Sequence, residues 1–144
     1  EAGAFIVATG RGDFPNQVNN SVGFPGILKG ALLVRAKKIT DNMAITAAKS
    51  LAKFAEKRGI NTENIVPKMD EMDVFPREAA DVAMQAIEDG VARIEMSWDE
   101  VYNLAKKDIS MSEKTLKMMT ESGLIDTPPD EMLQNALKFA IENV

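Results

Sequence analysis

A short apolar run that leads into a stretch rich in glycine, proline and asparagine constrains the fold of this chain more than any other feature. Residues 4–9, Ala-Phe-Ile-Val-Ala-Thr, are continuously apolar and partly β-branched, and the run ends at Gly10. Such a run is typical of a strand buried on both faces in a parallel sheet. Residues 10–26 hold four glycines, two prolines and three asparagines, so we expect a long, ordered and functional loop there.

The rest of the chain is predicted to be helical. Apolar residues at helical spacing, with capping and stop residues at their ends, predict helices over residues 26–38, 41–58 and 76–89. Two capping boxes, Ser97 with Glu100 and Ser110 with Glu113, predict two further helices that end near Asp108 and before Gly123. A last helix is expected from Thr127-Pro128 to about residue 143. The predicted fold class is α/β, mostly helical with one strand at about 4–9.

Composition excludes several kinds of chemistry. Cysteine and histidine are both absent from the 144 residues, which rules out disulfides, zinc–thiolate sites, a cysteine nucleophile and a serine–histidine triad. The net charge of −5 does not indicate a nucleic-acid partner, and no run approaches the length of a membrane span. We therefore expect no nucleic acid, no membrane and a cytoplasmic setting. A start at Glu1, with no methionine, predicts a fragment of a longer protein.

The segment Asn16-Gln17-Val18-Asn19-Asn20 is the best candidate site in the sequence. Amide side chains donate and accept hydrogen bonds without titrating, so they can hold a hydroxy acid without competing for its proton. They also cap turns and satisfy loop backbone, and composition alone favours that reading. A phosphate-binding glycine motif is not predicted, because Gly10 and Gly12 match its first two positions but Pro15 takes the third.

The wider pattern around these amides resembles a known family. Residues 8–20, continuing through Gly23-Phe24-Pro25-Gly26 and Lys29-Gly30-Ala31-Leu32, closely resemble the signature near the end of malic enzymes of the small bacterial and archaeal type. Weaker resemblance extends over residues 35–52 and 65–92. The resemblance implies that residues 1–93 are the C-terminal part of a Rossmann-like NAD(P)-binding domain. Residues 94–144 depart from the family pattern and are expected to form a helical C-terminal extension.

The resemblance implies oxidative decarboxylation of malate to pyruvate and CO2 with NAD or NADP and a divalent metal, Mg or Mn. In the family, the asparagine pair that matches Asn19 and Asn20 lies at the substrate, next to the nicotinamide. The catalytic lysine and tyrosine, the metal-binding carboxylates and the glycine-rich turn all lie upstream of this segment. The chain is therefore expected to supply no catalytic residue and no metal ligand, and to need the remainder of a malic enzyme chain, in a homodimer, for activity.

Other candidate groups favour structural interpretations. Tyr102 is expected to be a packing residue, and Asp70, Glu71 and Asp73 a solvated acidic loop, because they lack the spacing of metal ligands. The alternative to an enzyme fragment is a non-catalytic helical interaction module whose asparagine-rich loop is purely structural. In that case the C-terminal helices would offer an adaptable surface of methionines, Met111, Met118, Met119 and Met132.

Overall fold

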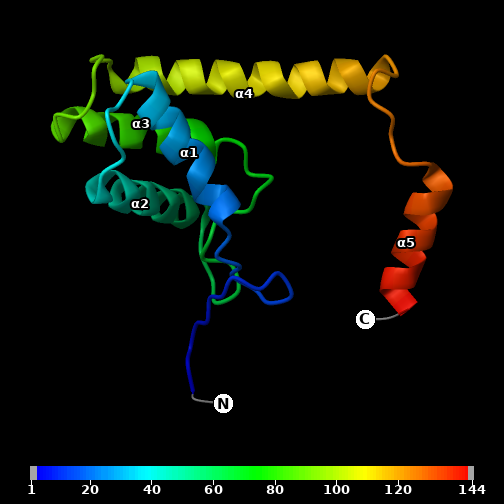
Figure 1. The fold of residues 1–144 in the computed structure, drawn as a ribbon. Coiled ribbons are helices and arrows are strands. Elements are labelled where there is room, and N and C mark those ends of the chain that lie inside the picture. Colours follow the sequence, from blue (N-terminus) through cyan, green and yellow to red (C-terminus); the bar gives the residue numbers. More distant parts are fainter. Residues whose placement is uncertain (1–2, 143–144) are drawn as a thin grey trace. The chain divides into compact units, whose positions relative to one another are not determined.

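The computed structural model describes residues 3–142, and every regular element in that range is a helix (Figure 1). In chain order the helices are α1 (Asn20–Leu33), α2 (Asp41–Arg58), α3 (Val74–Glu88), α4 (Trp98–Glu121) and α5 (Asp130–Glu142). The chain divides into two compact units, Glu1–Asp108 and Ile109–Val144. The first unit contains α1, α2, α3 and the first part of α4.

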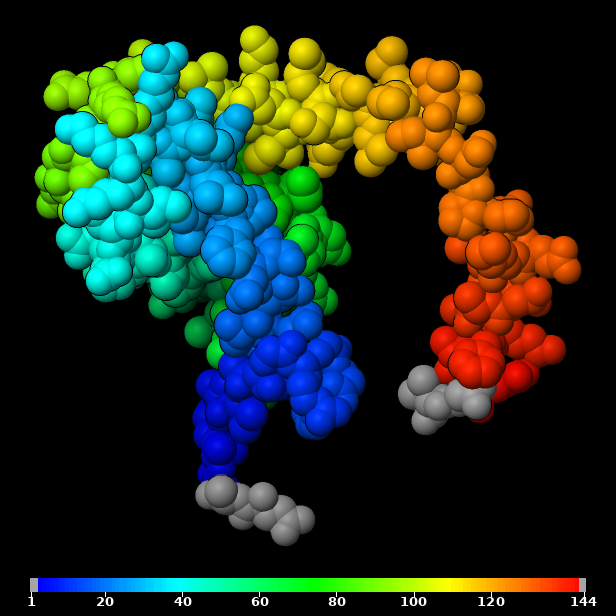
Figure 2. Space-filling model, viewed as in Figure 1, coloured from blue at the N-terminus to red at the C-terminus, as the bar shows by residue number. Residues whose placement is uncertain are grey.

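The strand expected at residues 4–9 is not present, so that prediction is wrong. Within residues 3–142 the β-type pairing is limited to two isolated bridges, Thr9 with Gln17 and Asn61 with Asn64. Phe5 and Val7 are 85% and 59% exposed, and the N-terminal segment lies at the surface of the first unit (dark blue in Figure 2). A parallel strand needs hydrogen-bonded neighbours and a covering layer on each face. The described residues provide neither.

Helix α1 begins earlier than the sequence predicts and takes up the second half of the expected loop. The side chain of Asn19 accepts a hydrogen bond from Ser21 N and caps the helix, which then runs through Pro25. Proline in a helix removes one backbone hydrogen bond and lowers helix propensity. Packing against α3 overrides that preference here. The helix ends at Leu33, because Arg35 adopts a left-handed conformation with φ of 50°.

The later helices follow their start and stop signals with one exception. Thr40 caps α2, Gly59 ends it with φ of 97°, and the capping box of Ser97 and Glu100 precedes α4, all as predicted. The expected break between residues 108 and 110 is wrong, since α4 continues to Glu121. No glycine or proline occurs between residues 98 and 121, so nothing in this stretch stops the helix.

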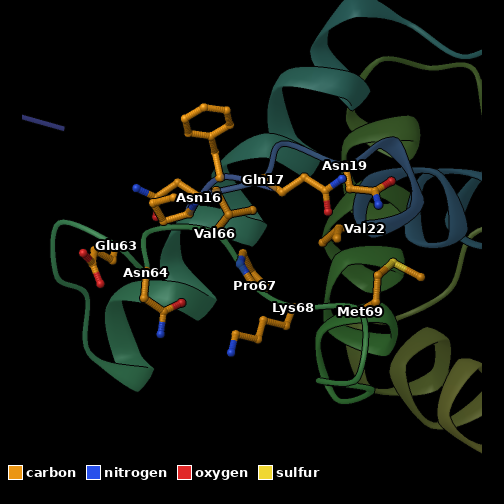
Figure 3. A pocket seen from close by; sticks show the side chains of 12 residues that line it. Asn16, Gln17, Asn19, Val22, Glu63, Asn64, Val66, Pro67, Lys68 and Met69 are labelled. Atoms are coloured by element: carbon orange, nitrogen blue, oxygen red, sulfur yellow. The ribbon is translucent and has the colours of Figure 1, made fainter. Parts of the chain in front are cut away.

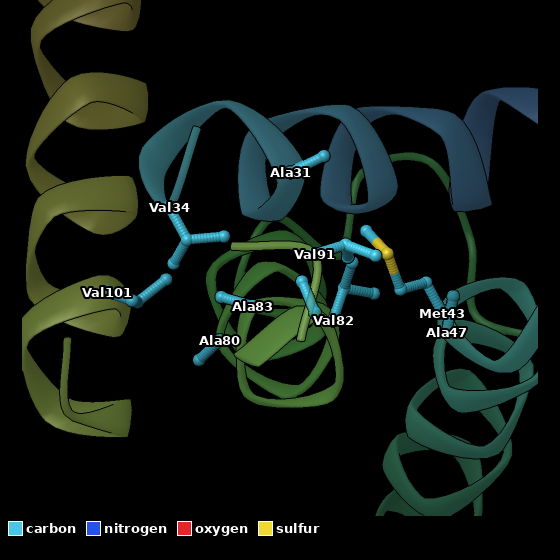
Figure 4. Close-up of a cluster of buried hydrophobic side chains, with 10 residues drawn as sticks. Ala31, Val34, Met43, Ala47, Ala80, Val82, Ala83, Val91 and Val101 are labelled. Atoms are coloured by element: carbon cyan, nitrogen blue, oxygen red, sulfur yellow. The ribbon is translucent and has the colours of Figure 1, made fainter. Parts of the chain in front are cut away.

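Helix α3 is the centre of the first unit. It packs against both α1 and α2, and its small side chains allow close approach. The core (Figure 4) joins residues of α1, α2, α3, the α3–α4 connection and α4. Its buried members are Ala31, Val34, Met43, Ala47, Ala80, Val82, Ala83, Ala86, Val91 and Val101. Most of these are alanine or valine, so the core depends on close helix packing rather than on bulky side chains.

Two glycines let α1 lie directly on α3. A Cβ added at Gly30 would overlap the backbone oxygen of Ala79, and one added at Gly26 would overlap the carboxyl group of Glu78. Gly23 is one turn closer to the start of α1, and a Cβ there would meet only ordinary contacts, the nearest at 3.8 Å. Small residues at an interhelical contact shorten the distance between the helix axes. The face of Gly26 and Gly30 therefore fixes where α1 lies.

Glu78 is a fully buried carboxyl group beneath this face. Its exposed fraction is 0%, and neither carboxyl oxygen has a hydrogen-bond partner of good geometry within the described residues. Burial raises the pKa of Glu78 to about 8, the nearby Gly26 amide partly opposes this, and the charge of Asp81 adds to it. A buried charge without a partner is strongly disfavoured. Glu78 is therefore held as the neutral acid at neutral pH.

The second unit, Ile109–Val144, contains the end of α4 and the whole of α5. None of the described residues of α5 is buried, and its larger apolar side chains are exposed: Met132, Leu133, Leu137, Phe139 and Ile141. The last helix begins close to its predicted start, and residue 143, where it was expected to end, lies outside the described residues. Among the described helices, none is both long enough and apolar enough to span a membrane.

Replacing Gly30 with alanine is expected to destabilise the protein. The added Cβ must displace the Ala79 backbone, a form of overpacking that costs about 1–3 kcal/mol. Gly23→Ala in the same helix is the matched control, because its Cβ finds room and alanine has the higher helix propensity. Thermal unfolding of both variants checks this prediction. An equal change in Tm for the two would show that α1 does not depend on a close contact at Gly30.

Glu78→Gln is expected to flatten the pH dependence of stability. The native pKa of about 8 lies above the ordinary value of 4.5, so between these pH values the native state holds a proton that the unfolded state has lost. Stability therefore falls as pH rises through this window, by up to about 1.4 kcal/mol per pH unit, and levels off above it. Glutamine is neutral throughout. Denaturant unfolding between pH 5 and pH 9 measures the difference, and identical slopes in both proteins would contradict it.

A candidate binding site at the start of helix α1

A pocket of about 430 Å³ lies beside the start of α1 (Figure 3). Two segments that are distant in sequence supply its lining, residues 14–22 and residues 62–69, which we call the α1 wall and the loop wall. The α1 wall contributes the amides Asn16, Gln17 and Asn19 together with apolar Val22. The loop wall contributes both charged and apolar side chains. An apolar surface with a few convergent polar groups is typical of a small-molecule site.

Asn19 is the predicted site residue that reaches this pocket. It is half-buried, and its Oδ1 accepts a hydrogen bond of 2.9 Å from Ser21 N. This N-cap fixes the amide plane, because the oxygen is held by the helix backbone. The Nδ2 group of Asn19 makes no hydrogen bond to residues 3–142. Its two donors are thus oriented by the cap and remain available to a ligand.

Asn20 is the first residue of α1 and does not line the pocket. Its side chain is exposed and makes no hydrogen bond within the described part of the chain. The structure therefore places the two predicted asparagines next to each other at one helix start, with different surroundings. Asn19 is held by the N-cap, whereas Asn20 is free to turn.

The other amides of the segment bind backbone groups of this chain. Asn16 is only 6% exposed and makes hydrogen bonds to three backbone positions. Gln17 Nε2 donates to Gly10 O at 3.3 Å. For these two residues the structural interpretation is the correct one. Sequence reasoning did not separate Asn16 from its neighbours, although its left-handed backbone, with φ of 57°, is a conformation that asparagine tolerates better than most residues.

The charges around the pocket suit an anionic ligand. Helix α1 has no acidic residue in its first turn, so its partial positive charge is not offset locally. Lys68 lines the loop wall and is exposed, with no ion pair within the described residues, and Glu63 is the acidic residue of that wall. Oriented amide donors, a helix N-terminus and a lysine form a favourable environment for a small carboxylate.

The remaining candidates occupy structural positions. Tyr102 stacks on Trp98 with ring centroids 5.0 Å apart, which confirms it as a packing residue. In the acidic stretch, Glu71 pairs with Arg58, and Asp73 lies 4.0 Å from Lys106 Nζ. Within the described residues, no three or more aspartate, glutamate, histidine or cysteine side chains are grouped so as to hold a metal ion.

Comparison with known proteins gives the family of the chain. Residues 5–88 match the family model described as malic enzyme, NAD binding domain. The chain belongs to the malic enzyme family. It is similar to the crystal structure of malic enzyme from Entamoeba histolytica, with 62% identity and a TM-score of 0.89 over 97% of this chain and 29% of that one. It also resembles malic enzyme from Pyrococcus horikoshii, with 44% identity and a TM-score of 0.77 over 83% of this chain and 27% of that one.

Curated relatives agree with this malic enzyme assignment. The bifunctional malic/malolactic enzyme of Bacillus subtilis is 44% identical over 107 residues, which is 74% of this chain and 26% of that protein. Further relatives carry the names NAD-dependent malic enzyme and NADP-dependent malic enzyme. The chain thus spans less than a third of the length of these proteins. It is part of a malic enzyme NAD-binding domain, which confirms the family resemblance seen in the sequence.

Asn19→Ala is expected to weaken the start of α1. Loss of the N-cap oxygen leaves Ser21 N without its partner and costs about 1 kcal/mol. Asn19→Ser keeps an oxygen that can cap the helix, so its stability is expected to remain close to that of the original protein. Comparing the Tm values of the two variants checks the cap. A serine variant as unstable as the alanine variant would contradict it.

Proposed function

We propose that this chain forms one wall of the malate site in a malic enzyme that converts malate to pyruvate and CO2 with NAD or NADP. In this proposal Asn19 and Asn20 bind the substrate next to the nicotinamide. The observation that carries it is the position of Asn19, whose N-cap orients its amide at the rim of a pocket. The family assignment supplies the substrate class.

The chemistry of these side chains fits a hydroxy dicarboxylate. An amide donates to a carboxylate or accepts from a hydroxyl at any pH, so it orients malate without removing its proton. The start of α1 adds a positive potential that favours the carboxylates and the pyrophosphate of the cofactor. A rigid donor keeps the substrate in a reactive orientation. Orientation is the main way in which a residue that transfers no proton can raise the reaction rate.

The described residues fit the nicotinamide cofactor and the divalent metal unequally. The nicotinamide cofactor, which accepts the hydride when bound, suits the helix N-terminus and neutral amides of the α1 wall. A divalent ion, Mg or Mn, does not fit the described residues, which contain no cluster of metal ligands. No step of the reaction is therefore assigned to a metal through this chain, and general acid and base roles are not assigned to it either.

The organisation of the whole protein follows from the same proposal. We assign residues 1–93 to a Rossmann-like NAD(P)-binding domain and residues 94–144 to a helical extension; the family model matches residues 5–88 of the first of these. The catalytic residues and metal ligands belong to the remainder of the malic enzyme chain, in a cytoplasmic homodimer. The exposed apolar residues near the N-terminus are consistent with further contacts to that remainder. The alternative, a non-catalytic helical module, would give the oriented amide of Asn19 no function.

Asn19→Ser and Asn20→Ala in the complete enzyme are expected to lower kcat/KM for malate by about 10- to 100-fold each, the usual value of a hydrogen bond to a charged group. Serine preserves the N-cap, so the loss would not come from unfolding of α1. Asn42→Ala is the control, because it removes an exposed amide whose hydrogen bond goes to Asp89 and which does not line the pocket, so kcat/KM for malate is expected to stay unchanged. Rates of NAD(P)H formation measure all three variants. Unchanged kinetics for both Asn19 and Asn20 variants would overturn the assignment.

A further inference from the structure

We infer that Asn16 is the positioning residue of this site, the side chain that holds the two walls of the pocket together and thereby sets the position of Asn19 relative to the loop wall. This inference rests on the proposed function, because it concerns the same pocket. Asn16 itself is not proposed to touch malate. Its part is to fix the distance between the α1 wall (residues 14–22) and the loop wall (residues 62–69).

The first observation is the set of hydrogen bonds that Asn16 makes. Its Nδ2 donates to Val7 O at 3.0 Å and to Thr62 O at 2.7 Å, and its Oδ1 accepts from Ile65 N at 2.9 Å. One amide thus links its own segment to Val7, nine positions earlier, and to the loop wall, more than forty positions later. Within the described residues, the hydrogen bonds between the two walls all involve this side chain.

The second observation is that Asn16 is buried and conformationally restricted. It is 6% exposed, and its backbone is left-handed with φ of 57°. A buried amide that loses its partners leaves polar backbone groups unsatisfied, so the three hydrogen bonds act together. Most residues pay a conformational penalty for positive φ, whereas asparagine and glycine tolerate it. Both the side chain and the backbone of this position therefore select asparagine.

The third observation is the short, restrained path from Asn16 to Asn19. Thr9 N donates to Asn16 O at 3.4 Å, and Val18 N donates to Thr9 O at 2.8 Å, so residues 16–18 are held along the N-terminal segment. Asn19 follows directly and caps α1. Only residues 17 and 18 separate Asn16 from the capping residue, and Val18 is itself bound to Thr9, so we expect a shift of Asn16 to change the position of Asn19. Displacement of a binding group by about 1 Å is enough to lower turnover by up to about 100-fold.

The test is a series of substitutions at this one position in the complete enzyme. Asn16→Gly removes the side-chain hydrogen bonds but still tolerates the left-handed backbone. Asn16→Ala removes the hydrogen bonds and also disfavours that backbone. Asn16→Asp keeps an oxygen that accepts from Ile65 N, but its second oxygen cannot donate to Val7 O and Thr62 O as Nδ2 does. We expect kcat/KM for malate to fall at least about tenfold in all three, with glycine the mildest. We also expect faster hydrogen exchange at the Ile65 amide, which loses its acceptor in the glycine and alanine variants.

A stability control separates positioning from general loosening of the fold. Val101→Ala removes core volume from α4, away from both walls, and is expected to lower Tm as much as the Asn16 variants while leaving KM and kcat unchanged. If the Asn16 variants have a lower Tm but the same kcat and KM as Val101→Ala, Asn16 only stabilises the fold and the inference is wrong. Loss of kcat/KM beyond that of Val101→Ala at equal Tm supports it.

A double substitution distinguishes failure of this inference from failure of the proposed function. If Asn16 acts through Asn19, adding Asn16→Gly to Asn19→Ser should reduce kcat/KM much less than it does alone. Fully additive losses would show that Asn16 does not act through Asn19, and would overturn the inference while leaving the substrate role of Asn19 intact. If Asn19→Ser itself leaves the kinetics unchanged, the proposed function fails first, whatever Asn16 does.

Discussion

The close contact between α1 and α3 is the constraint on which the first unit depends. Gly26 and Gly30 bring the backbone of α1 against Ala79 and Glu78, with no room for even one methyl group. This contact fixes the direction of α1, and therefore the place where its N-terminus and Asn19 meet the pocket. The core behind it is built of alanine and valine, so little bulk is present to absorb a displacement. The site is accordingly coupled to helix packing about two to three turns away.

Glu78 gives this contact an unusual property. A carboxyl group held without a hydrogen-bond partner stabilises the fold less than an apolar residue of similar size would. Its presence under the glycine face means that packing and protonation are linked at this position, because the neutral acid fits and the charged form does not. The helix that follows the Asn19 cap thus rests on a carboxyl group whose pKa burial raises to about 8.

The candidate site depends on one local and one long-range set of hydrogen bonds. Asn19 is held locally, by its own N-cap, whereas the pocket beside it exists only because the loop wall is brought back along the chain to Asn16. The amide of Asn16 uses both of its donors and an acceptor on backbone groups. Its neighbour Asn19 uses only its oxygen within the described residues. Two asparagines three positions apart therefore have different roles, one structural and one available for binding.

Local signals in the sequence determined the helices whose ends carry strong caps. Thr40, Gly59 and the pair of Ser97 and Glu100 mark real boundaries, because a cap is an interaction between residues that are close in sequence. The pattern from residue 8 to residue 32 also identified the family. The strand expected at residues 4–9 and the break expected within α4 were wrong, because the first requires partners distant in sequence and the second requires a stop residue that is missing.

Only the tertiary structure decided what the loop-like stretch becomes. Glycines and Pro25 predict an irregular loop, yet α1 passes through them because α3 packs closely against the helix face that carries Gly26 and Gly30. Only the fold separates Asn16 from Asn19, since the partners of Asn16 at residues 62 and 65 lie more than forty positions away. The sequence by itself determined the residue types and the family of this protein. The structure decided which partners each asparagine has, because hydrogen-bond partners are set by distance in space.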